Sequence, residues 1–164
     1  MKKLKRIILV IMVLALVAAE PLVANPISLD WDERGRLWVA CTPGYPYKEE
    51  FKGVPAHDEI VILSDGDGDG RMDGRLVFHH GLDLVTTLVR YGDGVIVGQA
   101  PDILYLRDTD GDGRADVIER LYSGFGYADT HATISNFRLG LDGWIYGTQG
   151  YSGGSSRHVL AHGD

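Results

Sequence analysis

The sequence predicts an all-β fold built from repeated units of about four short strands. Two segments, 57–81 and 101–126, align with an offset of 43 residues, counted from Asp65 to Asp108. Each contains a short apolar run, an Asp/Gly-rich loop, a second apolar run and then glycine. A second element, a tight turn followed by an apolar strand, recurs at 32–40, 92–98 and 141–147. Outside the N-terminal segment, no stretch keeps the 3.6-residue period of a helix.

Units of this composition are typical of the blades of a β-propeller. A blade holds four strands in roughly 40 to 50 residues, and the 22 glycines against 6 prolines indicate many tight turns. In the first unit, the fourth strand is expected at 84–90. The 164 residues provide about three such units, whereas closed propellers have about four to eight blades. We therefore expect residues 20–164 to form a partial β-propeller, a fragment of a longer domain.

Residues 1–19 have the composition of a signal peptide or an N-terminal anchor. Four basic residues precede an apolar run of 13 residues, Ile7 to Ala19. This run is shorter than the roughly 20 residues that span a membrane comfortably, but it suits a signal peptide, and Val17-Ala18-Ala19 offers a cleavage site. We expect an exported, periplasmic or extracytoplasmic protein, with an uncleaved membrane anchor or a buried first strand as the alternatives.

The net charge of -7 is concentrated in the two Asp/Gly-rich loops, which hold nine of the 23 acidic residues when Glu119 is included. The remaining 16 basic and 14 acidic residues nearly balance. This distribution fits local metal sites and provides no basic surface for a nucleic acid. The single cysteine, Cys41, excludes an intrachain disulfide, and the chain has no Cys-x-x-Cys-His motif for haem attachment.

The loop that starts at Asp108 has the ligand spacing of a calcium-binding loop. Ca²⁺ prefers hard oxygen ligands, which such loops supply from alternate positions around a glycine that makes the sharp bend. The predicted ligands are Asp108, Asp110, Asp112, the backbone carbonyl of Arg114, Asp116 and, at the bidentate position, Glu119. The alternative is a solvated acidic turn that binds no metal.

The loop that starts at Asp65 repeats this pattern without its last ligand. The predicted ligands are Asp65, Asp67, Asp69, the backbone carbonyl of Arg71, and Asp73. Leu76 occupies the bidentate position, so we expect this site to bind calcium more weakly. The flanking apolar runs are of β type, whereas an EF-hand needs helices. Both loops are therefore expected to be structural calcium sites between two strands of a blade.

His131 is the histidine whose surroundings most favour a chemical role. It lies in a polar loop just before the predicted strand pair 136–139 and 144–148, with Asp129 two residues earlier and Arg138 on the following strand. A histidine that is oriented by a carboxylate can act as a general base near neutral pH. A purely structural histidine is the alternative.

Taken together, these motifs resemble the membrane-bound dehydrogenase domain of the planctomycete-type (PVC-type) proteins. The resemblance is carried by AAEPLVANPISLDWDERGRLWVA, Tyr45-Pro46-Tyr47, the Asp/Gly loops, GFGYADTH and LDGWIYGTQG. It extends over nearly all of the chain after residue 18. The members of this family are large exported proteins that often continue into helical repeats and a c-type haem domain.

That domain is similar in turn to the propeller of soluble quinoprotein glucose dehydrogenase. The resemblance implies that His131, assisted by Asp129, deprotonates a sugar or polyol hydroxyl, and that a hydride passes to pyrroloquinoline quinone held near calcium. Arg138 is the candidate cofactor-binding residue, and a c-type haem would be the electron acceptor in the full-length protein. Leu141 replaces a proline of that family, the spacing differs by about one residue, and the ligands of the quinone and of the catalytic calcium lie on later blades. This chain alone is therefore expected to be inactive.

A second function stays open at this point. A calcium-stabilised propeller could bind glycans or proteins outside the cell without catalysing a reaction, because the same fold hosts many functions.

Overall fold

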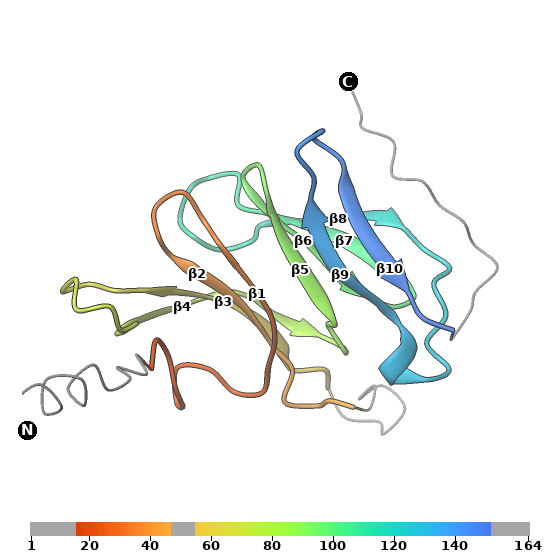
Figure 1. Ribbon diagram of the computed structural model, residues 1–164, viewed down its shortest axis with the longest axis horizontal. Helices are drawn as coiled ribbons and strands as arrows, with labels where there is room; N and C mark the ends of the chain where they lie inside the picture. The colour runs from red at the N-terminus through yellow and green to blue at the C-terminus, as the bar shows by residue number, and fades with distance from the viewer. Residues whose placement is uncertain (1–15, 47–54, 152–164) are drawn as a thin grey trace, which may run out of the picture.

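The computed structural model describes residues 16–46 and 55–151, and these residues form antiparallel sheets and one 3₁₀ turn (Figure 1). The first sheet has the order β1 (Pro26–Trp31), β2 (Leu37–Cys41), β3 (Asp58–Ser64), β4 (Gly74–Leu82). The second has the order β5 (Thr87–Tyr91), β6 (Gly94–Gln99), β7 (Asp102–Arg107), β8 (Val117–Tyr122). The 3₁₀ turn η3 (Thr130–Ala132) then leads into a two-stranded sheet of β9 (Ile134–Leu139) and β10 (Ile145–Gln149).

This architecture confirms the all-β, partial propeller fold, and it corrects how the strands are grouped. The segment predicted as the fourth strand of the first unit forms β5 and begins the second blade. The innermost strand of the first blade is β1, which the sequence analysis did not predict. The segment 117–122 is strand β8. Within the described residues there are two complete four-stranded blades and two strands of a third sheet.

The blades are held together by apolar cores that lie between neighbouring sheets. All five residues of β2 are buried, because alternate side chains enter different cores. Trp38 and Ala40 face the second blade, while Leu37, Val39 and Cys41 face the opposite side. In the second blade, Val95 and Val97 pack toward the first blade and Ile96 packs toward the third sheet.

The centre of the first interface is an aromatic pair. Trp38 and Phe78 meet edge to face with ring centroids 4.6 Å apart, and the guanidinium of Arg90 lies 4.2 Å from the Trp38 ring centroid. The indole nitrogen of Trp38 donates to Asp32 Oδ2 at 3.0 Å. Burial alone would raise the pKa of Asp32, but hydrogen bonds from Trp38, Arg36 and Arg34 outweigh it and hold this pKa at about 2. The pair is thus fixed by a buried, ionised carboxylate.

The first strands of the sheets, β1, β5 and β9, lie side by side (Figure 1). They are joined by side chains that accept hydrogen bonds from the neighbouring strand's backbone. Ser28 Oγ accepts from Leu88 N at 3.1 Å, and Asp30 Oδ2 accepts from Arg90 N at 2.9 Å. At the next junction, Thr87 Oγ1 accepts from Phe137 N at 2.9 Å. The inner strands β5 and β9 therefore each have edge N–H groups satisfied by the blade before them.

The antiparallel order places the connections of the chain at two opposite ends of the blades. One end carries the hairpin turns after β1, β5 and β9 and both Asp/Gly-rich loops, 65–73 and 108–116. The other end carries the β2–β3 connection, the β4–β5 and β6–β7 connections, and the loop with η3 that precedes β9. The end with the acidic loops is called here the loop end, and the other the η3 end.

The last residues of the predicted signal segment and the residues that follow it pack onto the outer face of the first blade. Val17, Ala18, Leu22 and Val23 cover the core formed by β2, β3 and Met72, and Met72 N donates to the carbonyl of Val17 at 2.7 Å. The basic residues and most of the apolar run predicted as a signal peptide lie outside the described residues. Within the described ranges, no helix is long and apolar enough to cross a membrane.

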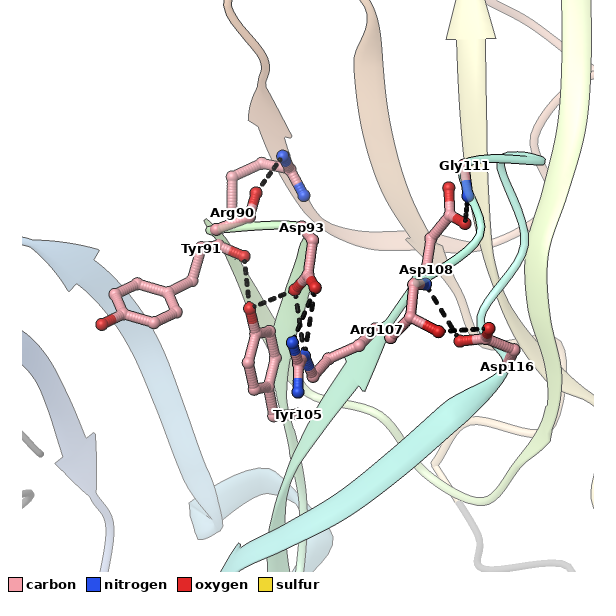
Figure 2. Close-up of polar contacts among 10 residues, drawn as sticks. Arg90, Tyr91, Asp93, Tyr105, Arg107, Asp108, Gly111 and Asp116 are labelled. Carbon is pink, nitrogen blue, oxygen red and sulfur yellow. Dashed lines mark hydrogen bonds and ion pairs between the residues drawn. The ribbon is translucent and has the colours of Figure 1, made fainter.

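A polar cluster closes the loop end of the second blade (Figure 2). The carboxylate of Asp93, in the β5–β6 turn, accepts from the Tyr105 hydroxyl at 2.7 Å and from Arg107 Nη2 at 2.8 Å. Asp93 also accepts, through its backbone carbonyl, the N–H of Asp108 at 3.2 Å. The hydrogen bond from Arg107, followed by that from Tyr105, lowers the pKa of Asp93 to about 2. Burial and then the bond to Asp93 raise the pKa of Tyr105 to about 12.

The junction between β5 and β9 gives the first prediction. Thr87→Val keeps the volume of this buried side chain but leaves the Phe137 N–H without its acceptor. We expect the free energy of unfolding to fall by about 1–3 kcal/mol, the cost of an unsatisfied buried donor, as measured by urea denaturation. Thr87→Ser keeps the hydroxyl and should lose clearly less. Equal losses for Val and Ser would show that the hydrogen bond contributes nothing.

The Asp93 cluster predicts a pH dependence at both extremes. Because the pKa of Asp93 is depressed in the folded protein, its stabilisation is present above the unfolded pKa of about 4 and is lost as the pH falls through about 2. Because the pKa of Tyr105 is raised, its stabilisation is complete below about pH 10 and is lost as the pH rises through about 12.

We expect Asp93→Asn to lower the unfolding free energy at pH 7 by about 0.5–1 kcal/mol, a range kept small because the pair is solvent-exposed. The same substitution should flatten the melting temperature between pH 4 and 2, as followed by calorimetry. Tyr105→Phe keeps the Arg107 ion pair, so it should remove the alkaline dependence and flatten the acid side only in part. If Asp93→Asn leaves the melting temperature between pH 4 and 2 unchanged, Asp93 is not the group that causes the acid dependence.

Candidate functional site

The two Asp/Gly-rich loops have the same internal hydrogen-bond pattern. In the second loop, Asp108 accepts from Gly111 N at 2.7 Å and from Gly113 N at 2.9 Å (Figure 2). In the first loop, Asp65 accepts from Gly68 N at 2.7 Å and from Gly70 N at 2.9 Å. The glycines adopt positive φ angles, which a side chain would disfavour. The first carboxylate of each loop thus forms the hub around which the backbone turns.

The next two carboxylates of each loop also support the turn through one oxygen. Asp110 Oδ1 accepts from Asp112 N at 3.2 Å, and Asp112 Oδ1 accepts from Arg114 N at 2.8 Å. The corresponding bonds from Asp69 N to Asp67 and from Arg71 N to Asp69 measure 3.1 and 2.8 Å. These bonds leave the second carboxylate oxygen of each residue to bind a cation.

Three carboxylates converge in each loop. One oxygen each from Asp108, Asp110 and Asp112 lie within 4.8 Å of one another, and the same holds for Asp65, Asp67 and Asp69. These are the hard oxygen ligands that Ca²⁺ prefers, and such a cluster of negative charges is repulsive until a cation neutralises it. The geometry therefore fits the first three predicted ligands of both loops, while metal binding itself stays a prediction.

The other predicted ligands of the two loops do not belong to these converging groups of three carboxylates. Asp116 accepts from Thr109 N at 3.0 Å and from the Thr109 hydroxyl at 2.6 Å, and these bonds lower its pKa. Asp73 holds Gly66 N at 2.9 Å in the same way. Both residues close their loops instead of joining the converging three. Glu119 lies within β8, opposite Tyr105, and Leu76 lies in β4. The carbonyls of Arg114 and Arg71 stay candidates from the sequence alone.

The second acidic loop also contacts the first blade. Ala115 N donates to the carbonyl of Phe78 in β4 at 2.8 Å, and a side chain on Gly113 would come within 2.6 Å of Leu76 Cδ2. The loop at Asp108 thus belongs to the interface between the blades. Its conformation and the docking of the two blades must depend on each other.

His131 and Asp129 lie together at the η3 end, as the sequence predicts. Asp129 is the N-cap of η3: its Oδ1 accepts from His131 N at 2.9 Å and lies 3.1 Å from His131 Nδ1. The His131 side chain is 67% exposed, and the Tyr45 ring meets it edge to face with centroids 5.8 Å apart. The histidine is therefore oriented by a carboxylate and remains open to a solute.

Tyr151 completes this group, and the sequence reasoning missed it. Its hydroxyl donates to Asp129 Oδ2. This bond, followed by those from the backbone and the ring of His131, lowers the pKa of Asp129. The contact joins residues 22 positions apart, and no local motif could reveal it. Asp129 thus stays ionised and can hold the His131 ring in the tautomer that carries its proton on Nδ1.

Arg138 lies apart from this dyad. It lines a groove of about 320 Å³ between the inner strands, together with Pro26–Leu29 of β1, Thr86 and Thr87 at the start of β5, and Ser135 and Asn136 of β9. His131 is not among the residues that line the groove. The structure therefore brings His131 and Asp129 together but does not place Arg138 in the same pocket. Asn136 has a φ of 58°, an unusual angle for a non-glycine residue inside a strand.

Comparison with a solved structure supports the fold. The chain aligns to the crystal structure of a proposed oxidoreductase (glucose dehydrogenase) from Thermus thermophilus with a TM-score of 0.53 and 20% sequence identity. The alignment covers 81% of this chain and 42% of that protein, so the chain spans less than half the length of the solved structure. At this identity the likeness shows the fold alone, and it supports the partial β-propeller.

Sequence comparison identifies a family without giving it an activity. No curated protein matches the chain. The family described as "Domain of unknown function (DUF7133)" matches residues 8–163. Since this match extends over nearly the whole sequence, the chain belongs to the DUF7133 family.

Proposed function

We propose that this chain is part of an exported, calcium-stabilised dehydrogenase propeller that oxidises a hydroxyl group of a sugar or polyol. The observation that carries the proposal is the contact between His131 Nδ1 and Asp129 Oδ1 at 3.1 Å in an exposed position at the η3 end. The likeness to a proposed glucose dehydrogenase supports it through the fold.

The dyad suits proton abstraction. When Nδ1 carries the proton and donates it to Asp129, Nε2 has a lone pair that can accept a proton from a substrate hydroxyl. The ionised Asp129 stabilises the imidazolium that forms. The exposure of the His131 side chain gives a substrate access to Nε2.

Two tyrosines provide a surface for a sugar beside this base. Tyr45 lies against the imidazole and Tyr151 against the carboxylate. Aromatic rings offer an apolar face to the C–H groups of a pyranose, and a phenol offers a polar tip. Tyr45 comes from the β2–β3 connection and Tyr151 follows β10, so the surface is assembled from separate parts of the chain.

Oxidation of an alcohol also requires a hydride acceptor. The family resemblance implies pyrroloquinoline quinone, which carries several carboxylates, followed by a c-type haem acceptor. The groove offers one guanidinium, Arg138, among the described residues that line it. This set does not amount to a quinone site, and no step is assigned here to the quinone or to the haem.

The acidic loops would serve stability and not the chemical step. They lie at the loop end, while the dyad lies at the η3 end. Calcium at Asp108, Asp110 and Asp112 would neutralise a repulsive cluster inside the interface between the blades. Calcium at Asp65, Asp67 and Asp69 would stabilise only the β3–β4 hairpin of the first blade.

A non-enzymatic propeller that binds glycans or proteins outside the cell is the second candidate. The same tyrosine surface and the same calcium loops would serve it. It differs in requiring no base, so a catalytic test of His131 separates the two functions.

Calcium removal tests the role of the loops. We expect calorimetric titration to give two binding events of unequal affinity, and saturation at about 100 times Kd to add about 2.7 kcal/mol of stability. Asp108→Ala should abolish the tighter event, and Asp65→Ala the weaker one. Glu33→Gln, in the β1–β2 turn, is the charge-matched control. Absence of binding at about millimolar calcium, the weak end for such loops, would refute the metal proposal.

The dyad is tested by dehydrogenase assay of the longest natural form of the protein, with quinone, calcium, an aldose and an artificial electron acceptor. His131→Asn should lower kcat by about 10²–10⁴-fold, the usual contribution of a general base. Asp129→Asn should lower kcat by a smaller factor, because the ring remains but loses its orientation. His57→Gln, a histidine outside the dyad, is the control. Activity that survives His131→Asn at the level of this control would exclude the dyad.

A further inference from the structure

The groove between the inner strands has a polar lining that the dyad does not explain. It lies where β1, β5 and β9 approach one another, and it measures about 320 Å³. Ile27 and Leu29 form its apolar part. The polar part comes from hydroxyl groups, one amide and one guanidinium.

The hydroxyl groups of Ser28 and Thr87 each accept a hydrogen bond from a backbone N–H, so the hydrogen of each hydroxyl is still available to donate. Ser28 Oγ accepts the N–H of Leu88 at 3.1 Å, and Thr87 Oγ1 accepts the N–H of Phe137 at 2.9 Å. A hydroxyl group has one hydrogen to donate besides its acceptor lone pairs. Thr87 is only 2% exposed, so it is a buried polar group at the wall of the groove. Because these bonds between the blades occupy the oxygen atoms as acceptors, the two hydroxyl groups can act as hydrogen-bond donors along the groove.

Arg138 adds positive charge to these donors. It carries the only charge among the described residues that line the groove. The contact of its guanidinium within the described residues is a long one, 3.4 Å from Nη1 to the neighbouring carbonyl of Phe137. Beside it, the amide nitrogen of Asn136 lies 3.3 Å from Thr148 Oγ1, and this bond orients the amide. A guanidinium and convergent hydroxyls are the groups that recognise a carboxylate.

We propose that this groove binds the carboxylate of a sugar acid, such as a uronate or an aldonate. Arg138 pairs with the carboxylate, and the Ser28 and Thr87 hydroxyls donate to the oxygen atoms of the ligand. The apolar side chains of Ile27 and Leu29 cover its C–H groups. The proposal does not rest on the proposed function, because the dyad does not line the groove and the binding itself requires no catalysis.

Calorimetric titration of the purified, calcium-loaded chain with glucuronate, gluconate and glucose tests the proposal at constant ionic strength. We expect both acids to bind and glucose to bind at least about tenfold more weakly, as expected when a charged hydrogen bond is lost. Arg138→Ala should weaken glucuronate binding by about tenfold or more and leave glucose binding unchanged. Arg138→Lys should retain part of the affinity, because it keeps the charge and loses the fork of donors.

Arg120→Ala is the matched control. Arg120 is an exposed arginine of β8 that pairs with Asp102 at 3.3 Å, away from the groove, and its removal should not change glucuronate binding. Equal affinities for glucuronate and glucose would overturn the proposal, and so would equal losses in Arg138→Ala and Arg120→Ala. Displacement of glucuronate by stoichiometric pyrroloquinoline quinone would assign the carboxylate site to the cofactor, and would overturn the proposal of a sugar-acid site. Because no turnover is measured, an inactive dyad cannot produce any of these results.

Discussion

Stacking of the blades requires that the backbone at the edge of each inner strand finds partners outside its own sheet. The first strand of a blade pairs with the second strand along one edge, and along the other edge its N–H groups have no strand partner. An exposed edge of this kind is unsatisfied and invites aggregation. In this chain the N–H groups of Leu88, Arg90 and Phe137 bond to side chains of the preceding inner strand. These acceptors are the polar side chains of Ser28, Asp30 and Thr87. Apolar side chains at the same positions would leave the edge amides unpaired.

This arrangement determines where chemistry can occur. Because the inner strands lie side by side, their first residues converge at the η3 end, next to the loop that carries Asp129 and His131. The acidic loops lie at the other end, where strands three and four of each blade are joined. The loop at Asp108 reaches back to Phe78 of the first blade, so order at the loop end supports the same blade interface that aligns the inner strands. The two ends are therefore coupled through the interface, although they are separated along the blades.

The sequence predicts best the features that depend on neighbouring residues. The carboxylates and glycines of the acidic loops interact over two to five positions, so their order alone specifies the turn. The short apolar runs of β2 and β6 after their turns likewise indicate strands. Strand β1 alternates apolar and polar residues, as strands do, and the sequence reasoning overlooked it. What its sequence alone does not reveal is the partner of Ser28 and Asp30, which is β5, 60 residues away. The contact of Tyr151 with Asp129 and the groove around Arg138 also depend on long-range packing, which no local motif encodes.

Amide hydrogen exchange, resolved by residue, tests the stacking of the blades most directly. The account predicts strong protection for the N–H groups of Leu88, Arg90 and Phe137, comparable to that of residues in the middle of β6, because each of them is bonded to the preceding blade. Exchange of these three amides at the rate of a free strand edge, while the amides that pair β5 with β6 stay protected, would contradict it. In that case the sheets would be independent hairpin assemblies, and neither the groove nor the position of the dyad would follow from the fold.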